Sequence, residues 1–270
     1  MPADQSAPVT PDHLRVERPA EGVVRLVLDN PEQRNAMSAP MTEAWVDAVS
    51  ALEGDPSVRV VVVTGEGAAF CSGGDISWIA SEPDAPVDAL RTRMMAFYRA
   101  WLSIRRLEVP TIAAVNGPAI GAGLCLALAC DLRYAAAGAR LGAPFVRLGM
   151  NPGMAATHLL PEVVGLAAAR ELLLTGRLVE ADEAERLGLV NRVFAAEDLA
   201  AQVQQVAEQI AATAPVPSRY TTLSLRQQHR DLEACLQYEA LAQPVTLATQ
   251  DLQEGIAASR ERRTPRFVGR

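Results

Sequence analysis

Two glycine-rich turns constrain what this chain can fold into. One is FCSGGDI at 70–76, and the other is NGPAIGAG at 116–123. Each follows an apolar strand-like run, at 58–64 and 111–115, and each leads into a predicted helix. If the fold brings the two turns face to face, two backbone N–H groups can point at one oxygen atom. Such an oxyanion hole stabilises the negative charge that develops on a carbonyl oxygen, and one built from backbone alone suits thioester enolate chemistry.

The composition indicates a globular protein without nucleic-acid or membrane partners. Hydrophobic residues make up 49% of the 270 residues, enough for one large domain or a domain with an appendage. The formal net charge of −7 disfavours binding to nucleic acid or to an anionic membrane. No apolar run reaches the length of a membrane span, and neither a secretory signal nor a transit peptide is apparent. We therefore expect a cytoplasmic protein.

The residue types present exclude several kinds of site. All 25 basic residues are Arg, which excludes Schiff-base chemistry on lysine, pyridoxal phosphate attachment and a P-loop. A phosphate on a ligand must therefore be held by Arg or by backbone N–H. The cysteines have no CxxC spacing, and the histidines lie far apart, so we expect neither a metal site nor a disulfide framework. Mostly buried, reduced thiols are expected at Cys71, Cys125, Cys130 and Cys235.

The order of predicted elements favours the α/β class. Strands are predicted at 23–28, 58–64, 111–115, 131–135 and 189–194, and helices at about 41–52, 88–107, 165–174 and 181–186. Beyond 194 the pattern is helical throughout. A helix through 199–210 is followed by Pro215 and Pro217, which are expected to break it, and then by two further helices. A helical tail after an α/β core often packs on a neighbouring subunit, which favours an oligomer.

Two other enzyme classes fail on motif. A serine hydrolase would need GxSxG, but Ser72 lacks the leading glycine. A dinucleotide site would need GxGxxG, and GPAIGAG does not have that spacing.

Five segments, in this order, resemble the crotonase (enoyl-CoA hydratase/isomerase) superfamily. They are DNPEQRNAMS (29–38), VVVTGEGAAFCSGGDI (61–76), PTIAAVNGPAIGAGLCLALACDLRYAA (110–136), LGMNPGMAAT (148–157) and LLLTGRLVEADEAERLGLVNRV (172–193). The resemblance implies a spiral of repeated ββα units, a helical C-terminal trimerisation region and a coenzyme A thioester as ligand, with no covalently bound cofactor. It implies a homotrimer or a dimer of trimers. We accordingly expect a flexible tail at 1–12, a core at 13–200 and an oligomerisation region at 201–270.

The resemblance also assigns candidate binding residues. The oxyanion donors of the family match the N–H groups of Gly74 and Ala122. A glycine or alanine is needed at both positions, because a larger side chain would block the acyl group. The path of the nucleotide and pantetheine matches Arg34, Ala36, Ser72, Gly73, Asp75 and Ile76, and Arg262 is a candidate for reaching the CoA phosphates of a neighbouring subunit.

The acid and base positions of the family are not acidic here. The two glutamates of hydratases fall on Cys125 and Phe145, and the aspartate of some isomerases and dehalogenases falls on Gly153. A thiol could exchange a proton, but its ordinary pKa is about 8.5 and apolar burial raises it. Two hypotheses stay open: a lyase or isomerase with an unassigned base, and a non-catalytic acyl-CoA-binding protein of the same fold.

Other ionisable groups could supply the missing base. His158 follows Gly153 by one helical turn and is a candidate, although helix packing is the simpler interpretation. Asp75 is most simply a helix N-cap or turn residue. Tyr98 is interpreted as a residue of the pocket or the core. Weaker candidates are Glu66, Glu82, Asp84 and Asp88.

Overall fold

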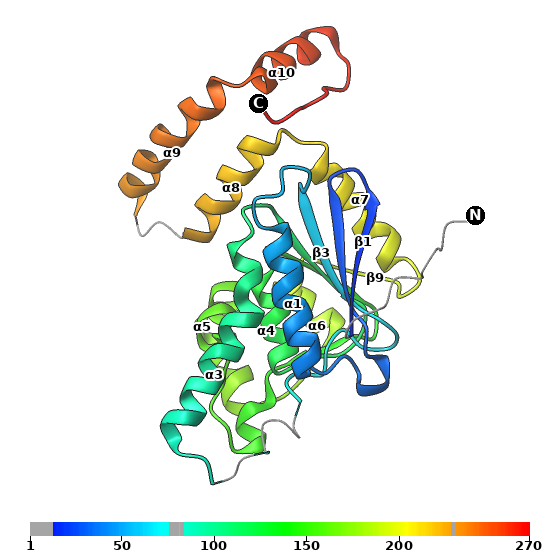
Figure 1. Ribbon diagram of the computed structural model, residues 1–270, viewed down its shortest axis with the longest axis vertical. Coiled ribbons are helices and arrows are strands. Elements are labelled where there is room, and N and C mark those ends of the chain that lie inside the picture. The colour runs from blue at the N-terminus through cyan, green and yellow to red at the C-terminus, as the bar shows by residue number, and fades with distance from the viewer. Residues whose placement is uncertain (1–12, 76–80, 82–83, 228–230) are drawn as a thin grey trace, which may run out of the picture.

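A six-stranded sheet forms the centre of the fold in the computed structural model, which describes residues 13–75, 81, 84–227 and 231–270 (Figure 1). The tail predicted at 1–12 lies outside these residues. The strand order is β1-β2-β3-β4-β6-β9, and only the β1–β2 hairpin is antiparallel. The bounds are β1 (Leu14–Ala20), β2 (Val23–Leu28), β3 (Val60–Gly65), β4 (Thr111–Val115), β6 (Leu132–Ala136) and β9 (Arg192–Phe194).

Both faces of this sheet are buried, as the continuous apolar strands predict. In β3, Val61 and Val63 face one core cluster, while Val60 and Val62 face another. The second cluster lies under α7 (Leu199–Ala211), which buries Leu199 and three further residues against the sheet. The alternation follows from the two-residue period of a strand.

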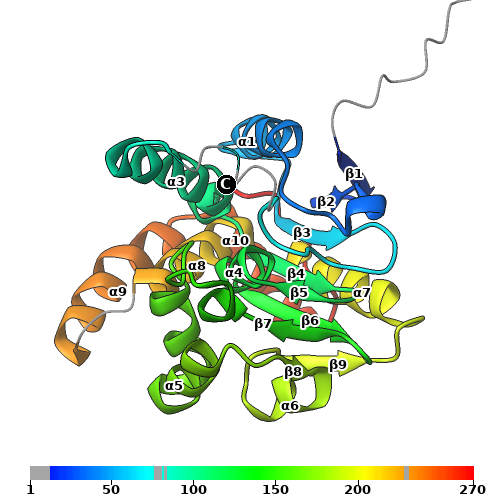
Figure 2. The same ribbon diagram turned by 90° about the horizontal axis from the view of Figure 1, so that it is seen from below.

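Helices α1 (Ala39–Leu52), α3 (Val87–Trp101) and α4 (Ala122–Ala129) pack into the first cluster. Trp45 of α1 stacks on Trp101 of α3 with ring centroids 5.0 Å apart. All eight residues of α4 are buried, as expected of a helix that is apolar on every side. Figure 2 shows α1 and α3 toward the β1–β3 end of the strands, and α5 (Ala156–Thr175) and α6 (Ala181–Arg186) toward β8 and β9.

A second, three-stranded sheet of β5 (Ala119–Ile120), β7 (Arg140–Gly142) and β8 (Val179–Glu180) is absent from the sequence predictions. These strands are two or three residues long, which is too short for a periodic signal. The described residues also contain three 3₁₀ helices: η1 (Pro31–Gln33), η2 (Leu102–Arg106) and η3 (Pro144–Leu148).

Several predicted bounds need correction. The helix predicted at 88–107 ends at Trp101 and continues as η2. The two helices predicted after Pro152 and at 165–174 form one element, α5, which begins at Ala156 and has a kink at Gly165, where φ is +76°. The helix through 199–210 does end before Pro215, and Pro215 also begins the next helix, because a proline in the first turn loses no hydrogen bond.

Three helices follow α7, where two were predicted: α8 (Pro215–Gln227), α9 (Leu232–Leu247) and α10 (Gln250–Glu261). The side chains of Asp231 and Thr249 cap the last two and separate them. Figure 1 shows α8, α9 and α10 gathered at one end of the molecule. Because α7 packs on the sheet, the core extends past the boundary predicted at residue 200.

Arg226 attaches α8 to the core. Its side chain is 9% exposed and binds both carboxylate oxygens of Asp131, at 2.7 and 2.6 Å. It also donates to the backbone carbonyls of Arg105, Leu107 and Val109.

We expect Arg226→Met to lower the free energy of unfolding by about 3–5 kcal/mol, because it leaves the Asp131 carboxylate without its charged partner. Urea denaturation measures the change. Arg106→Met is the control, since Arg106 and Glu53 form a 3.6 Å pair with side chains 53% and 47% exposed. Equal denaturation midpoints for the two variants would contradict this role of Arg226.

Candidate active site

The two glycine turns pair with each other through their backbones. The N–H of Cys71 donates to the carbonyl of Pro118 at 3.1 Å, and the N–H of Ile120 donates to the carbonyl of Cys71 at 2.9 Å. The stretch that leads into the first turn thus runs parallel to β5, which leads into the second. The sequence prediction that the turns could meet is consistent with this pairing.

The approach of the two turns is close enough to require glycine at Gly73. A Cβ there would lie 2.9 Å from the carbonyl oxygen of Ile120 and 3.5 Å from the nitrogen of Ala122. Its φ of +106° also disfavours any other residue. Residue 74 is therefore held beside the start of α4.

Both predicted oxyanion donors have unused N–H groups. Ala122 is the first residue of α4, where the N–H has no acceptor within the helix. Within the described parts of the chain, no residue accepts a hydrogen bond from the N–H of Ala122 or of Gly74. The first turn of α4 adds the positive end of its helix dipole at this point.

The segment predicted to hold CoA lies against the other side of the first turn. The N–H of Ser72 donates to the carbonyl of Arg34 at 3.0 Å, and the N–H of Met37 donates to the carbonyl of Gly73 at 2.8 Å. Arg34 and Ala36 are therefore neighbours of the 72–75 backbone, and Arg34 is exposed. Ile76, the last residue of that predicted path, lies outside the described residues.

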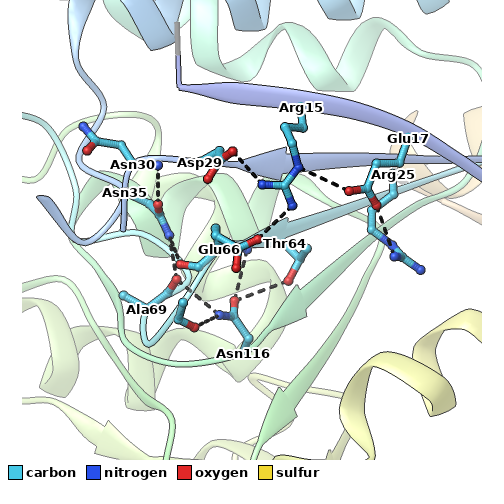
Figure 3. Close-up of polar contacts among 12 residues, drawn as sticks. Arg15, Glu17, Arg25, Asp29, Asn30, Asn35, Thr64, Glu66, Ala69 and Asn116 are labelled. Carbon is cyan, nitrogen blue, oxygen red and sulfur yellow. Dashed lines mark hydrogen bonds and ion pairs between the residues drawn. The ribbon is translucent and has the colours of Figure 1, made fainter. Parts of the chain in front are cut away.

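Two asparagine side chains hold the loop between β3 and Cys71 (Figure 3). Asn116, which begins the second turn, accepts from the N–H of Gly65 at 3.0 Å and donates to the carbonyl of Gly67 at 2.9 Å. Asn35 donates to the carbonyls of Glu66 and Ala69, at 2.9 and 2.8 Å. Sequence reasoning quoted both residues inside motifs and missed this role. An amide beside a glycine turn was the only signal that could have indicated it.

Figure 3 also shows Arg15 beside this loop, between Asp29 and Glu66. It pairs with Asp29 at 2.5 Å and with Glu66 at 2.8 Å. These pairs engage Glu66, which makes it a weak candidate for the base.

The three departures from the family lie around the start of α4. Cys125 is buried, and its Sγ lies 3.6 Å from the carbonyl oxygen of Gly153, to which it donates. Burial raises the pKa of the Cys125 thiol to about 12. A Cβ on Gly121, the residue before Ala122, would lie 3.8 Å from the ring of Phe145. Phe145 therefore borders the proposed oxyanion position, and neither side chain can act as a base at neutral pH.

Tyr98, predicted as a residue of the pocket or the core, is partly buried against the core. A Cβ at Gly153 would lie 2.9 Å from Cζ of Tyr98, so the phenol lies at the third of these positions. The signal in the sequence was weak, because Tyr98 comes from α3, far from the glycine turns along the chain.

The other candidates lie apart from this group. The side chain of His158 is 69% exposed, and its Nε2 lies 2.8 Å from Glu162, one helical turn on. Asp84 and Asp88 are exposed, and Glu82 is outside the described residues. Arg262 is the C-cap residue of α10. Figure 1 shows α8 between α10 and the helices α4 and α5. In one chain, then, Arg262 is not part of this site.

A separate cavity of about 640 Å³ lies between α8 and the core. Arg226, Asp131 and Glu162 are among its lining residues, and no described residue of the turns at 70–76 and 116–123 lines it. We do not assign this cavity to the acyl group. Within the described residues, no group of three His, Cys, Asp or Glu side chains could hold a metal ion, and no helix is long and apolar enough to cross a membrane.

The thiols should differ in reactivity. Cys71, Cys125 and Cys130 are buried, and burial raises the pKa of each to about 12. Cys235 is partly exposed, although its hydrogen bond to Glu239 raises its pKa.

We expect a disulfide reagent at pH 8 to modify one thiol per native chain and four in guanidinium. Glu239→Gln should speed the native reaction, because it removes the negative charge that favours the protonated thiol. Fast modification of two or more native thiols would contradict this assignment.

Comparison with known proteins identifies the family. Residues 18–270 match the family model described as enoyl-CoA hydratase/isomerase. A crotonyl-CoA hydratase of Syntrophomonas wolfei is 34% identical over 254 residues, covering 93% of this chain and 96% of that protein.

Solved structures show the same fold. The crystal structure of an enoyl-CoA hydratase from Bacillus anthracis superposes with a TM-score of 0.90 at 32% identity, covering 96% of this chain and all of that one. An enoyl-CoA hydratase from Polaromonas superposes with a TM-score of 0.88 at 32% identity, covering 94% and 99%. With its paired glycine turns and its mixed α/β core followed by helices, this chain belongs to the enoyl-CoA hydratase/isomerase family of the crotonase superfamily.

Proposed function

We propose that this protein binds an acyl-CoA thioester with its carbonyl oxygen between the N–H groups of Gly74 and Ala122. The two donors stabilise the enolate form of the thioester, and each is worth a few kcal/mol in a site that excludes water. One observation supports the proposal: the backbone of Cys71 pairs with that of Pro118 to Ile120, and among the described residues none accepts a hydrogen bond from the N–H of Gly74 or of Ala122.

The surroundings support a CoA ligand. Arg34 is exposed beside the 72–75 backbone, where it can reach a phosphate, and backbone N–H groups supply further donors. The family match favours the same ligand, since its named relative acts on crotonyl-CoA.

Hydration of an enoyl thioester is not the activity that this site favours. Adding water needs a group that takes a proton from water and a group that delivers one to carbon. Cys125 stays protonated at neutral pH because burial raises its pKa to about 12, and Phe145 has no ionisable group. This observation disfavours hydration, and the second candidate function is a non-catalytic acyl-CoA-binding protein of the same fold.

Calorimetry with butyryl-CoA and with free CoA tests the binding proposal. We expect butyryl-CoA to bind more tightly than free CoA, because only the thioester reaches the two donors. Equal affinities would contradict a role for Gly74 and Ala122, and absence of binding to either would contradict the whole proposal. A crotonyl-CoA hydration assay on the same sample separates the enzyme from the binding protein.

Restoring the glutamates should not restore a hydratase. We expect Cys125→Glu/Phe145→Glu to gain little hydration activity and to lose thermal stability. A carboxylate at 125 would be buried without a designed partner and would tend to stay protonated. The melting temperature and crotonyl-CoA turnover of the double variant measure both effects, with Cys125→Ser as the control. Efficient hydration by a stable double variant would instead indicate a pocket still built for adding water.

We also propose that the chain forms a homotrimer or a dimer of trimers. The C-terminal helices leave large apolar side chains uncovered, among them Leu225, Leu232 and Leu241, which are 74%, 74% and 78% exposed. A neighbouring subunit that covers them could also bring Arg262 to its partner's CoA. Sedimentation equilibrium would test the assembly, and a monomer at micromolar concentration would contradict it.

A further inference from the structure

Tyr98 and Gly153 fit together as one unit. A Cβ at Gly153 would lie 2.9 Å from Cζ of Tyr98, and closer still to its hydroxyl oxygen. Such distances do not occur between real side chains, so any residue other than glycine at 153 must displace the phenol. The lack of a side chain at 153 is thus what lets the Tyr98 hydroxyl occupy this place.

A chain of contacts connects this hydroxyl to the proposed oxyanion hole. Cys125 lies three residues after Ala122 on α4, so the two residues share a helix face, with Cβ atoms about 5–6 Å apart. The Cys125 thiol donates to the carbonyl of Gly153, and Gly153 adjoins the Tyr98 hydroxyl. The hydroxyl therefore lies near the face of α4 that carries Ala122 and Cys125.

The chemical state of Tyr98 suits a proton donor. Its side chain is partly buried, and across the described residues none forms a hydrogen bond with its hydroxyl. Burial, and then the neighbouring Cys125, raise the pKa of Tyr98 above its ordinary value, so the hydroxyl keeps its proton at neutral pH. Among the described contacts of Gly153, the only other group with an acidic hydrogen is the Cys125 thiol. That thiol already donates its hydrogen to the Gly153 carbonyl.

We propose that Tyr98 is the residue that delivers a proton to the α-carbon of the bound thioester. The proton passes from the phenol oxygen to the α-carbon of the enolate and forms a C–H bond. The electron pair of the enolate double bond makes this bond, while the negative oxygen between Gly74 and Ala122 becomes a thioester carbonyl again. Water then returns a proton to the Tyr98 phenolate and leaves as hydroxide. In the reverse direction hydroxide takes the phenol proton, the phenolate takes an α-proton, and the C–H electron pair moves to form the enolate, so an α-proton exchanges with solvent. This inference rests on the proposed thioester binding, because without it no enolate forms here.

Exchange of the α-protons of 3-butenoyl-CoA in D₂O, followed by proton NMR, tests this role without requiring the natural substrate. We expect the protein to introduce deuterium and Tyr98→Phe to slow this by on the order of 10²-fold or more, the usual worth of a positioned acid or base. The variant keeps the aromatic ring that contacts Phe97. Gly153→Ala should slow exchange similarly, because it displaces the hydroxyl without removing it, and the double variant should be no slower than Tyr98→Phe.

Tyr134→Phe is the matched control. Tyr134 is also a partly buried tyrosine whose pKa burial raises, but it packs against Phe194 beneath α7 on the other face of the sheet. We expect its exchange rate to equal that of the unmodified protein.

Calorimetric binding of butyryl-CoA is measured for every variant. If all of them bind the thioester but Tyr98→Phe exchanges at the unmodified rate, or the unmodified protein does not exchange at all, the role of Tyr98 is overturned and the binding proposal stands. If the unmodified protein does not bind the thioester, both proposals are overturned.

Discussion

Crotonyl-CoA hydration by this protein should be slower than by an efficient hydratase by on the order of 10⁴-fold or more. A positioned acid and a positioned base each contribute roughly 10²–10⁴-fold. The two positions that match the catalytic glutamates of hydratases hold Cys125 and Phe145. The buried thiol cannot replace either carboxylate, since burial raises its pKa to about 12.

The loss of absorbance of the enoyl thioester measures this rate. The crotonyl-CoA hydratase of Syntrophomonas wolfei is the positive control under the same conditions. Turnover near 10³ s⁻¹, at the upper end for ordinary enzymes, would show that a base active in hydration is present. His158→Ala, Cys125→Ala and Tyr98→Phe would then identify it.

Ala122→Pro should reduce α-proton exchange by about 10²–10³-fold, the usual cost of losing one oxyanion donor. Ala122 is the first residue of α4, where proline is well tolerated because that N–H has no helical acceptor. The substitution therefore removes the donor while preserving the helix, and its ring occupies the space in front of the missing N–H.

The comparison that isolates the N–H is Ala122→Ser, which keeps the donor and a small side chain. Gly74→Pro should resemble Ala122→Pro, while Gly74→Ala keeps its N–H and should stay close to the unmodified protein. Exchange by Ala122→Pro at the rate of Ala122→Ser, with both folded, would remove the second donor from the account.

The parts of the fold with strong periodicity could be predicted from sequence. The β-branched run of β3 and the helical spacing of Met41, Trp45 and Val49 report directly on burial, and both elements are where they were expected. The short strands β5 and β7 carry no such period, yet they position the second turn through the hydrogen bond from Gly121 N–H to the Gly142 carbonyl. Their pairing depends on contacts distant along the chain.

Some features of the candidate site could likewise be predicted from sequence, and others could not. The glycines of the two turns predicted a close backbone approach, and their neighbours Arg34 and Ser72 do lie together. Tyr98 could not be assigned from sequence, because a tyrosine in an amphipathic helix has the same pattern whether its hydroxyl meets solvent or Gly153. The exposure of His158 likewise depends on how α5 is oriented about its axis, which the 155–160 sequence alone leaves open.

Isotope-edited infrared spectroscopy of crotonyl-CoA labelled with ¹³C at the thioester carbonyl tests the central claim most directly. Two N–H donors on one oxygen weaken the C=O bond, so we predict that the carbonyl band moves to lower frequency when the protein is saturated with ligand. The band should move less in Ala122→Pro and in Gly74→Pro than in Ala122→Ser. A saturated complex whose carbonyl band stays at the frequency of free crotonyl-CoA would contradict an oxyanion hole at Gly74 and Ala122.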